Sequence, residues 1–257
     1  MRPLGIMAAM HDEIASILDD MDAGAEKRTI GRRDYYVGQW QGRPCVVVLA
    51  RIGKVAAAAT AVTLIREFNV QGILFTGVAG AVAADVCVGD IVVAHELLQY
   101  DLDVRPLFPR YEVPLLGQSR FRADPALTQV LQAAASSYIE KDFFLDVALP
   151  VRDQFQVREP RLHCGLIISG DCFVSDSHVL RELRQRLPSA LCLEMEGAAV
   201  AQICYEYATP FAVLRVVSDR ADDHAGVDFP AFLKNVARYY SAGILRTLLT
   251  AQPALGS

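Results

Sequence analysis

The sequence contains no long hydrophobic run and no concentration of basic residues. Its longest apolar stretches, Pro44–Ala50 and Pro210–Val217, are far shorter than the roughly 20 residues that a transmembrane helix needs. Lysine and arginine are interspersed with a slight excess of aspartate and glutamate, which gives a net charge of -5. Because phosphate backbones are bound by clustered cations, we expect neither a nucleic-acid partner nor a membrane partner. The N-terminus also lacks a basic segment followed by an apolar one, so we expect a cytoplasmic location.

Cysteine pairs and metal-ligand spacings are missing as well. The six cysteines follow no CxxC pattern. Those that lie in apolar runs are Cys45, Cys87, Cys192 and Cys204. We interpret them as buried, reduced thiols rather than as disulfides or zinc ligands. The five histidines, among them His224 after two aspartates, show no ligand spacing, so we expect no metal and no cofactor.

Low-complexity segments and linker-like changes in composition are also absent, which is typical of one globular domain over residues 1–257. Hydrophobic residues make up 53% of the chain, and short β-type apolar runs alternate with amphipathic segments. The predicted strands are Gly5–Met10, Tyr35–Trp40, Cys45–Ala50, Gly72–Phe75, Asp90–Ala94, Gly165–Ile168, Ala190–Leu193 and Phe211–Val217. The predicted helices are Asp12–Met21, Lys54–Phe68, Asp124–Tyr138, Ser177–Leu187, Glu196–Tyr207 and Pro230–Thr250.

This alternation predicts an α/β fold with a mostly parallel or mixed sheet that is covered by helices on both faces. The loop Gln41-Gly42-Arg43-Pro44 predicts a hairpin, and Asp124 followed by Pro125 predicts the start of a helix. The strands Gly72–Phe75 and Asp90–Ala94 are close enough in sequence that we expect them to be neighbours. The segments that resist assignment are Asp103–Arg122, which has the composition of a long loop, and Lys141–Leu162.

Glycines and polar residues follow six of the predicted strands. These segments are His11-Asp12-Glu13, Arg51-Ile52-Gly53-Lys54, Thr76-Gly77-Val78-Ala79-Gly80, Ser169-Gly170-Asp171, Glu194-Met195-Glu196 and Ser218-Asp219. In parallel-type α/β sheets, ligands bind beyond the carboxyl ends of the strands. No single segment is specific, because an aspartate after a strand is commonly a helix cap and Gly53-Lys54 lacks the upstream glycine of a phosphate-binding loop. Together they predict a nucleoside-sized pocket at one edge of the sheet.

The ordered set of motifs resembles that of the 5'-methylthioadenosine/S-adenosylhomocysteine nucleosidases of the purine nucleoside phosphorylase superfamily. The matching segments are Ala8–Glu13, Ile52–Ala57, Thr76–Gly80, Val88–Val92, Ser169–Phe173, Glu194–Glu196 and Arg215–Asp219. The Glu-Met-Glu and Ser-Asp motifs are the most specific of these. The resemblance implies a nucleoside phosphorylase-like fold with a central twisted mixed β-sheet flanked by helices. It also implies a homodimer that acts on a small-molecule adenine nucleoside in methionine salvage.

The resemblance further implies roles for individual residues. Asp219, oriented by Ser218, would protonate the purine at N7. Glu13, with Arg215 beside it, would activate the attacking water, and Glu196 would hold the ribose hydroxyls. The remaining substrate contacts would be Met195 beneath the sugar, Phe173 and Val174 at the base, Phe229 over the pocket, and Val78 near the water. A loop of the partner subunit would enclose the 5' end, and its candidates are Leu107, Phe108 and Pro114.

These residue types fit the chemistry of glycosidic-bond hydrolysis. Adenine leaves once a ring nitrogen is protonated, so a buried aspartate kept partly neutral is a useful acid. The ribose then gains oxocarbenium character, which a carboxylate stabilises, and water adds from the opposite face. The departures from the family pattern are Val78 in place of serine or threonine, Gly80-Ala81 in place of Gly-Gly, and the length of Lys141–Leu162.

Three other functions stay open at this point. Phosphorolysis would need converging cationic donors, for which Arg51 is the candidate, although Glu13 would repel a phosphate. A hydrolase of futalosine-type nucleosides would use the same catalytic residues and differ in its 5' pocket. A non-catalytic nucleoside-binding module is disfavoured because both Glu13 and Asp219 are present.

Overall fold

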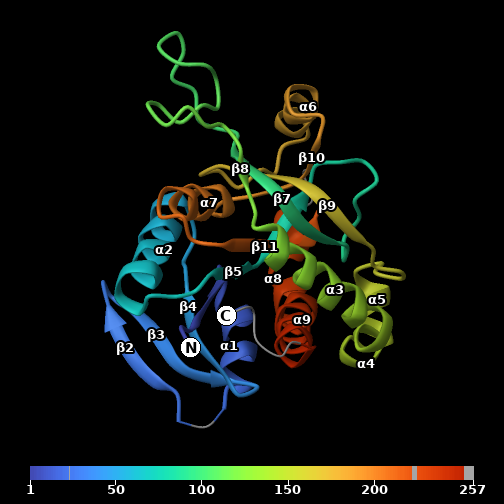
Figure 1. The fold of residues 1–257 in the computed structure, drawn as a ribbon. Coiled ribbons are helices and arrows are strands. Elements are labelled where there is room, and N and C mark those ends of the chain that lie inside the picture. The colour runs from blue at the N-terminus through green and yellow to red at the C-terminus, as the bar shows by residue number, and fades with distance from the viewer. Residues whose placement is uncertain (23, 222–224, 252–257) are drawn as a thin grey trace.

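The structure, a computed structural model, describes residues 1–22, 24–221 and 225–251 (Figure 1). Among these residues, eleven strands form one mixed sheet in the order β2-β3-β4-β1-β5-β11-β6-β10-β9-β7-β8. The strands are β1 (Leu4–Ala8), β2 (Glu26–Ile30), β3 (Arg33–Trp40), β4 (Arg43–Leu49), β5 (Ile73–Thr76), β6 (Val78–Ala81), β7 (Ile91–Gln99), β8 (Phe121–Arg122), β9 (Leu162–Ser169), β10 (Ala190–Glu194) and β11 (Phe211–Asp219). The helices are α1 (His11–Asp19), α2 (Lys54–Phe68), α3 (Pro125–Lys141), α4 (Phe143–Asp146), α5 (Leu149–Gln154), α6 (Ser177–Arg186), α7 (Gly197–Glu206), α8 (Ala225–Phe232), the π-helical turn η1 (Leu233–Ala237) and α9 (Arg238–Ala251).

Strand β11 joins the two parts of the sheet. Its first residues pair with β5, and Leu214–Val216 pair with β7 on the other edge. Its last residues pair with β6, and β6, β10, β9 and β7 follow one another, so these strands curl back onto β11. The expectation that β5 and β7 are neighbours is therefore wrong. A strand from near the end of the chain lies between them, and local spacing carries no signal of such a long-range insertion.

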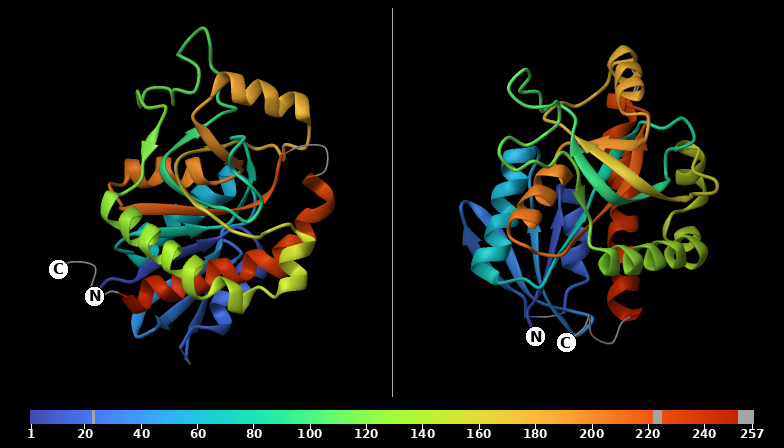
Figure 2. Two further views of the ribbon diagram at one scale, coloured as in Figure 1. Left: turned by 90° about the vertical axis from the view of Figure 1, so that its right-hand side faces the viewer. Right: turned by 45° about the horizontal axis from the view of Figure 1, so that its top comes forward.

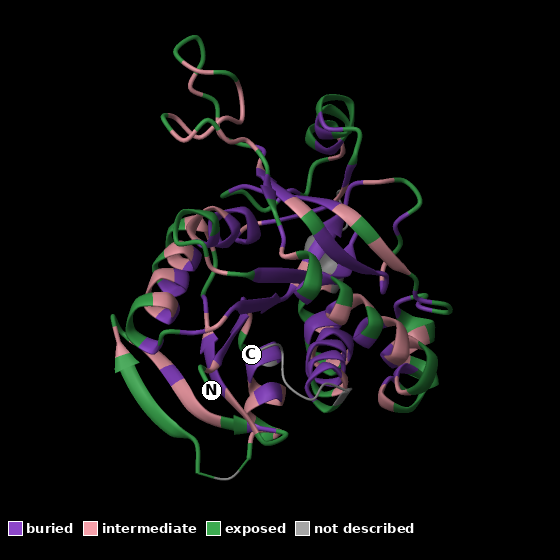
Figure 3. Ribbon diagram, viewed as in Figure 1, coloured by how far each residue is buried: buried purple, intermediate pink, exposed green. Residues whose placement is uncertain are grey.

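Helices cover both faces of the sheet, as predicted. One face carries α1, α3 and α9, and the other carries α2 and α7 (Figures 1 and 2). Successive side chains of a strand point to opposite faces, and β1 follows this rule. Leu4 and Ile6 belong to the apolar core beneath α1 and α9, whereas Met7 belongs to the core beneath α2. The central strands β5 and β11 are consequently buried throughout (Figure 3).

Local signals in the sequence placed several elements well. Helix α2 has the predicted bounds, and β3 and β4 form the predicted antiparallel hairpin. Asp124 caps α3 by accepting the Leu127 N–H at 2.8 Å, with proline in the first turn. The last helix, however, starts at Ala225 rather than at Pro230. Pro230 lies inside α8, and the π-helical turn η1 separates α8 from α9.

The elements missed from the sequence lack a clear hydrophobic period. Four of the five residues of β2 are exposed, and β6 is four residues long. The segment Asp103–Arg122 is a loop except for β8 at its end, and it extends away from the body of the protein (Figure 1). The segment Lys141–Leu162 contains the short helices α4 and α5.

The cysteines of the described residues are all free thiols. Cys45, Cys192 and Cys204 are buried as predicted, but Cys87 is exposed because it lies in the loop before β7 rather than in a strand. Burial raises the pKa of the Cys45 thiol to about 12. Among the described residues, no three His, Cys, Asp or Glu side chains gather as metal ligands, and no helix is long and apolar enough to cross a membrane. His224 lies outside the described residues.

Candidate active site

A pocket of about 280 Å³ lies beyond the carboxyl ends of the strands, where the sequence predicted one. This volume is close to the lower end of the roughly 300–1,000 Å³ of small-molecule sites. Four of the six polar segments predicted at strand ends contribute lining residues, whereas His11-Asp12-Glu13 and Ser169-Gly170-Asp171 are represented only by residues next to them in the sequence. The described residues that line the pocket are Ala9, Met10, Ile52, Val78, Ala79, Gly80, Cys172, Phe173, Val174, Leu193, Glu194, Met195, Glu196, Ser218, Asp219 and Phe229.

Asp219 stands at the end of β11 and is 7% exposed. Its carboxylate accepts the hydroxyl of Ser218 at 2.8 Å and the N–H of Ala221 at 2.7 Å. Gly80 lies directly opposite, and a Cβ there would come within 2.9 Å of an Asp219 carboxylate oxygen. A larger residue at this position would therefore displace the carboxylate. The Ser-Asp motif and Gly80 together hold an acid at the pocket wall.

Glu196 is the second carboxylate of the pocket and is 4% exposed. Its Oε1 accepts the N–H of Gly53 at 2.8 Å, a contact that joins the ends of β4 and β10 across 143 residues of sequence. Gly53 itself has a φ of 97°, a conformation that favours glycine. Burial and then the charge of Glu194 raise the pKa of Glu196 to about 7, against the lowering effect of the Gly53 N–H. Glu196 can therefore change its charge near neutral pH.

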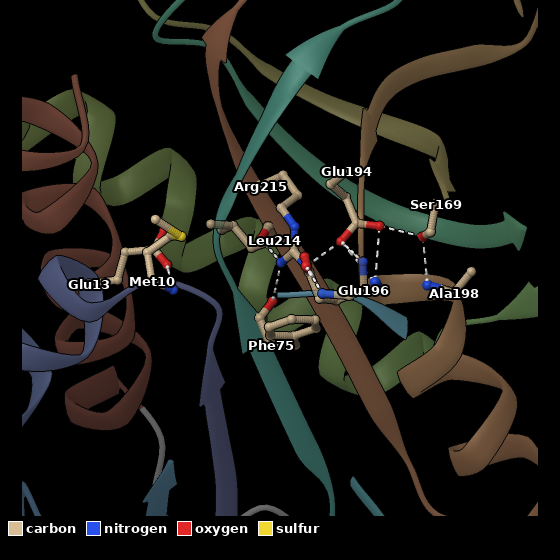
Figure 4. Close-up of polar contacts among 11 residues, drawn as sticks. Met10, Glu13, Phe75, Ser169, Glu194, Glu196, Ala198, Leu214 and Arg215 are labelled. Atoms are coloured by element: carbon tan, nitrogen blue, oxygen red, sulfur yellow. Dashed lines mark hydrogen bonds and ion pairs between the residues drawn. The ribbon is translucent and has the colours of Figure 1, made fainter. Parts of the chain in front are cut away.

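Glu194, two residues earlier, belongs to a buried polar cluster with Ser169 and Arg215, which we call the Glu194 cluster (Figure 4). Its carboxylate forms an ion pair with Arg215 Nη2 at 2.7 Å and accepts the hydroxyl of Ser169. It also accepts the N–H groups of Glu196 and Gly197, while Ser169 Oγ accepts that of the next residue, Ala198, at 2.7 Å. The first N–H groups of a helix have no partner inside it, so this cluster caps α7.

Arg215 is the cation of this cluster and is fully buried. Its Nη1 donates to the carbonyls of Leu214 at 2.9 Å and Phe75 at 3.3 Å, and its guanidinium carbon lies 4.1 Å from the centroid of the Phe75 ring. The resemblance placed Arg215 beside Glu13, whereas its ion pair in the structure is with Glu194. Arg215 therefore lies beneath the pocket rather than among its lining residues.

Apolar side chains complete the pocket. Phe173 is 47% exposed, and its ring lies edge-on to that of Phe229 with 5.7 Å between the centroids. Val174 is buried beside it, and Val78 and Met195 are partly exposed on the lining. The structure thus brings these five predicted contact residues together around one cavity. Aromatic rings beside carboxylates suit a ligand with one flat, apolar part and one polar part.

Two other sequence candidates lie outside the lining of the pocket. Glu13 is buried in the first turn of α1, where its Oε2 accepts the N–H of Met10 at 3.1 Å (Figure 4). Because Met10 does line the pocket, Glu13 stands directly behind the wall. Arg51 lines a different cavity, and no lysine or arginine is among the described lining residues of the pocket.

Sequence reasoning missed the function of Glu194 and Ser169 in the site. Both were visible at strand ends, but spacing alone cannot tell which glutamate of Glu-Met-Glu faces the ligand and which faces the helix. A second signal was available, because a carboxylate before a predicted helix start is suited to capping N–H groups. Met10 and Ile52 belong to matching segments for which the resemblance implies no individual role, and both line the pocket.

Comparisons with known proteins agree with this geometry. The family model of the phosphorylase superfamily matches residues 3–250. A 5'-methylthioadenosine/S-adenosylhomocysteine nucleosidase of Shewanella denitrificans is 32% identical over 96% of this chain and 98% of the relative. A nucleosidase of that name from Neisseria meningitidis, in complex with methylthio-immucillin-A, is 32% identical, with a TM-score of 0.85 over 98% of this chain and 100% of that one. A futalosine hydrolase of Helicobacter pylori is 29% identical, with a TM-score of 0.81 over 98% of both chains.

Proposed function

Because the chain belongs to the phosphorylase superfamily, and within it to the 5'-methylthioadenosine/S-adenosylhomocysteine nucleosidases, we propose that it hydrolyses the N-glycosidic bond of these two nucleosides and releases adenine. The observation that carries the proposal is one pocket in which aromatic rings adjoin three carboxylates, Glu194, Glu196 and Asp219, and no lysine or arginine lines the wall among the described residues. The aromatic rings match an adenine ring, the carboxylates match a ribose, and the apolar side chains of the lining match a thio group.

Asp219 is the general acid of the proposed reaction. It protonates N7 of the adenine, so that the base leaves as a neutral molecule instead of an anion. The hydroxyl of Ser218, 2.8 Å from the carboxylate, orients it, and Phe173 and Val174 hold the base in place. Low exposure of Asp219 supports this role because it keeps bulk water away from the proton that is transferred.

Glu196 and Met195 hold the sugar. A carboxylate accepts hydrogen bonds from the ribose hydroxyls and stabilises the positive charge that develops on the ring as the bond breaks. The Glu194 cluster acts through the backbone, because it fixes the start of α7 and with it the position of Glu196. Arg215 is in this reading a positioning residue rather than a direct contact of the nucleoside.

Water, rather than phosphate, is the proposed nucleophile. A phosphate dianion needs cationic or N–H donors around it. The described wall offers Glu194, Glu196 and Asp219 instead, and Arg51 belongs to a neighbouring cavity. Glu13, directly behind Met10, is the base that activates the water. Val78 lies on the lining where relatives commonly carry a hydroxyl, so the water depends more heavily on Glu13 here.

The first test is the release of adenine from 5'-methylthioadenosine, measured side by side with and without phosphate. Equal release in both reactions, with free methylthioribose as the second product, is the expected result. Release only with phosphate would make the protein a phosphorylase. If futalosine yields free base and both adenine nucleosides do not, the substrate is that of the Helicobacter pylori relative.

A second test concerns the role of Glu13 as the general base. Glu13→Gln keeps the size of the side chain and its contact to Met10 but cannot take up a proton. We expect hydrolysis to fall by about 10²–10⁴-fold while nucleoside binding stays measurable by calorimetry. A variant with normal turnover would assign the base to another group.

The remaining expectations complete the proposal. The chain works as one nucleosidase domain over residues 1–257, as a cytoplasmic homodimer in methionine salvage. The exposed Leu107, in the loop that extends from the body, supports a second subunit covering the 5' end of the pocket. Phe108 and Pro114 lie in the same loop.

A further inference from the structure

A second cavity lies beside the candidate active site and has different chemistry. It measures about 360 Å³ and lies between one face of α1 and the strands β3 and β4. Its polar lining residues are His11, Asp19, Arg32, Arg33, Asp34 and Arg51. We call it the arginine cavity, because three of these side chains are guanidinium groups.

The two cavities share a partition. Met10 and Ile52 line the active-site pocket, whereas their sequence neighbours His11 and Arg51 line the arginine cavity. A backbone hydrogen bond of 2.8 Å joins the ends of β1 and β4 just before these residues. Arg51 has a φ of 66°, so the chain turns at the point where the two side chains part. A ligand that passes the edge of this partition can contact both cavities.

The arginines of this cavity have spare donors. Arg51 Nη2 donates to the carbonyl of Arg32, and Arg33 Nη2 donates to that of Ala56 at 3.3 Å. In the described part of the chain, none of the three arginines forms an ion pair with a carboxylate. Asp34, which lines the same cavity, is bound by Lys27 at 3.2 Å and by Thr29 at 2.7 Å, and the charge of Arg51 is among the causes that lower its pKa. Guanidinium groups that keep free donors are suited to a carboxylate ligand, which they bind in a fork geometry.

We propose that the arginine cavity binds the amino-acid tail of S-adenosylhomocysteine, with the tail carboxylate on Arg32 and Arg51. This inference rests on the function proposed above. With the base at Asp219 and the ribose at Glu196, the Gly53 N–H that Glu196 accepts places Ile52 beside the sugar. The 5' substituent then runs along apolar Met10 and Ile52. A methylthio group ends there, whereas a homocysteine tail continues past the partition to the arginines.

The chemistry of the tail matches the lining at both of its charges. Its carboxylate meets the guanidinium groups, and its ammonium group meets Asp19, an acidic residue of the same cavity. Methylthioadenosine has neither charge, so the arginine cavity distinguishes the two substrates without touching the reacting bond.

The test compares kcat/KM for the two substrates in Arg32→Gln and Arg51→Gln. We expect the value for S-adenosylhomocysteine to fall by about tenfold, which is the size of one charge-assisted contact, and that for methylthioadenosine to stay within about twofold. Arg158→Gln removes an equal charge from an exposed residue outside both cavities and is the matched control. The carboxamide of S-adenosylhomocysteine gives a second readout, because the wild type should prefer the acid and Arg32→Gln should not.

The possible failures are distinguishable. Equal losses for both substrates, or no loss for either, would overturn the tail site while leaving the nucleosidase function intact. If the wild type released no adenine from either substrate, the proposed function would fail first and the tail site with it.

Discussion

The Glu194 cluster and the pocket wall made by Glu196, Ser218 and Asp219, which we call the acidic wall, use the same residue types in opposite ways. In the Glu194 cluster, a guanidinium group balances the carboxylate at 2.7 Å, and both groups are buried. On the acidic wall, Glu196 and Asp219 accept hydrogen bonds from neutral N–H and O–H donors. One residue of sequence therefore separates Glu194, which pairs with a guanidinium group, from Glu196, whose pKa is raised to about 7.

The difference shows how one segment serves both the fold and the chemistry. A buried charge with a partner fixes a structure, because removal of either group leaves the other uncompensated. Burial raises the pKa of Glu196, so this carboxyl group keeps an affinity for protons near neutral pH, which is the property that acid–base catalysis needs. The Glu-Met-Glu segment has one residue of each kind, and both residues directly precede the start of α7 at Gly197.

The largest expected effect is on the acidic wall. Asp219→Asn preserves the shape of the side chain and its contacts to Ser218 but removes the proton that adenine needs. We expect the rate of adenine release to fall by about 10²–10⁴-fold, with little change in the midpoint of urea unfolding. A variant that keeps the full rate would show that Asp219 is not the acid. The acidic wall would then not differ from the Glu194 cluster in the way described above.

The next effect concerns the Glu194 cluster. Glu194→Gln leaves Arg215 as a buried cation without a counter-charge, so we expect the free energy of unfolding to fall by about 3–5 kcal/mol. Urea unfolding measures this loss. The control is Glu182→Gln, which breaks an exposed ion pair with Arg186 and should cost below about 1 kcal/mol. Equal losses in the two variants would mean that Glu194 and Arg215 do not act as a buried pair.

We expect Glu196→Gln to raise the stability of the protein while it lowers the activity. The folded protein raises the pKa of Glu196 to about 7 from its ordinary value of 4.5. Between about pH 4.5 and 7 the folded state holds a proton that the unfolded state has lost, so stability falls as pH rises through this window. The variant does not ionise, and above pH 7 it should therefore be more stable than the wild type by about 1–3 kcal/mol.

The measurement is urea unfolding of both proteins at about pH 5 and about pH 8, together with adenine release. The stability difference should appear mainly at the higher pH, while the variant loses activity because the ribose hydroxyls lose a charged acceptor. If the stability difference between the wild type and the variant were the same at both pH values, the fold would not raise the pKa of Glu196.

How far the sequence predicts this contrast depends on the range of the interactions. Strands, helices and the polar residues at strand ends follow from local periodicity and capping, and four of the six polar segments, with the residues next to the other two, line one pocket. The sequence does not predict which group each charged side chain contacts. Glu196 meets Gly53 across 143 residues, and Arg215 meets Glu194 across a sheet whose order depends on the insertion of β11. No periodicity within one segment encodes such pairings, so the distinction between the two glutamates required the structure.

The smallest expected effect comes from adding a donor to the acidic wall. Val78 lines the same pocket as these carboxylates, and Val78→Ser introduces the hydroxyl of the family pattern at this position. A hydroxyl that helps hold the attacking water should raise kcat by about two- to tenfold, because positioning of a nucleophile lowers the barrier. The exchange also removes a partly buried apolar group at a cost of about 1 kcal/mol, which urea unfolding reports separately.

A rise in kcat at reduced stability would mean that this wall, unlike the Glu194 cluster, is not optimised for stability. An unchanged kcat would instead assign the positioning of the water to Glu13 alone.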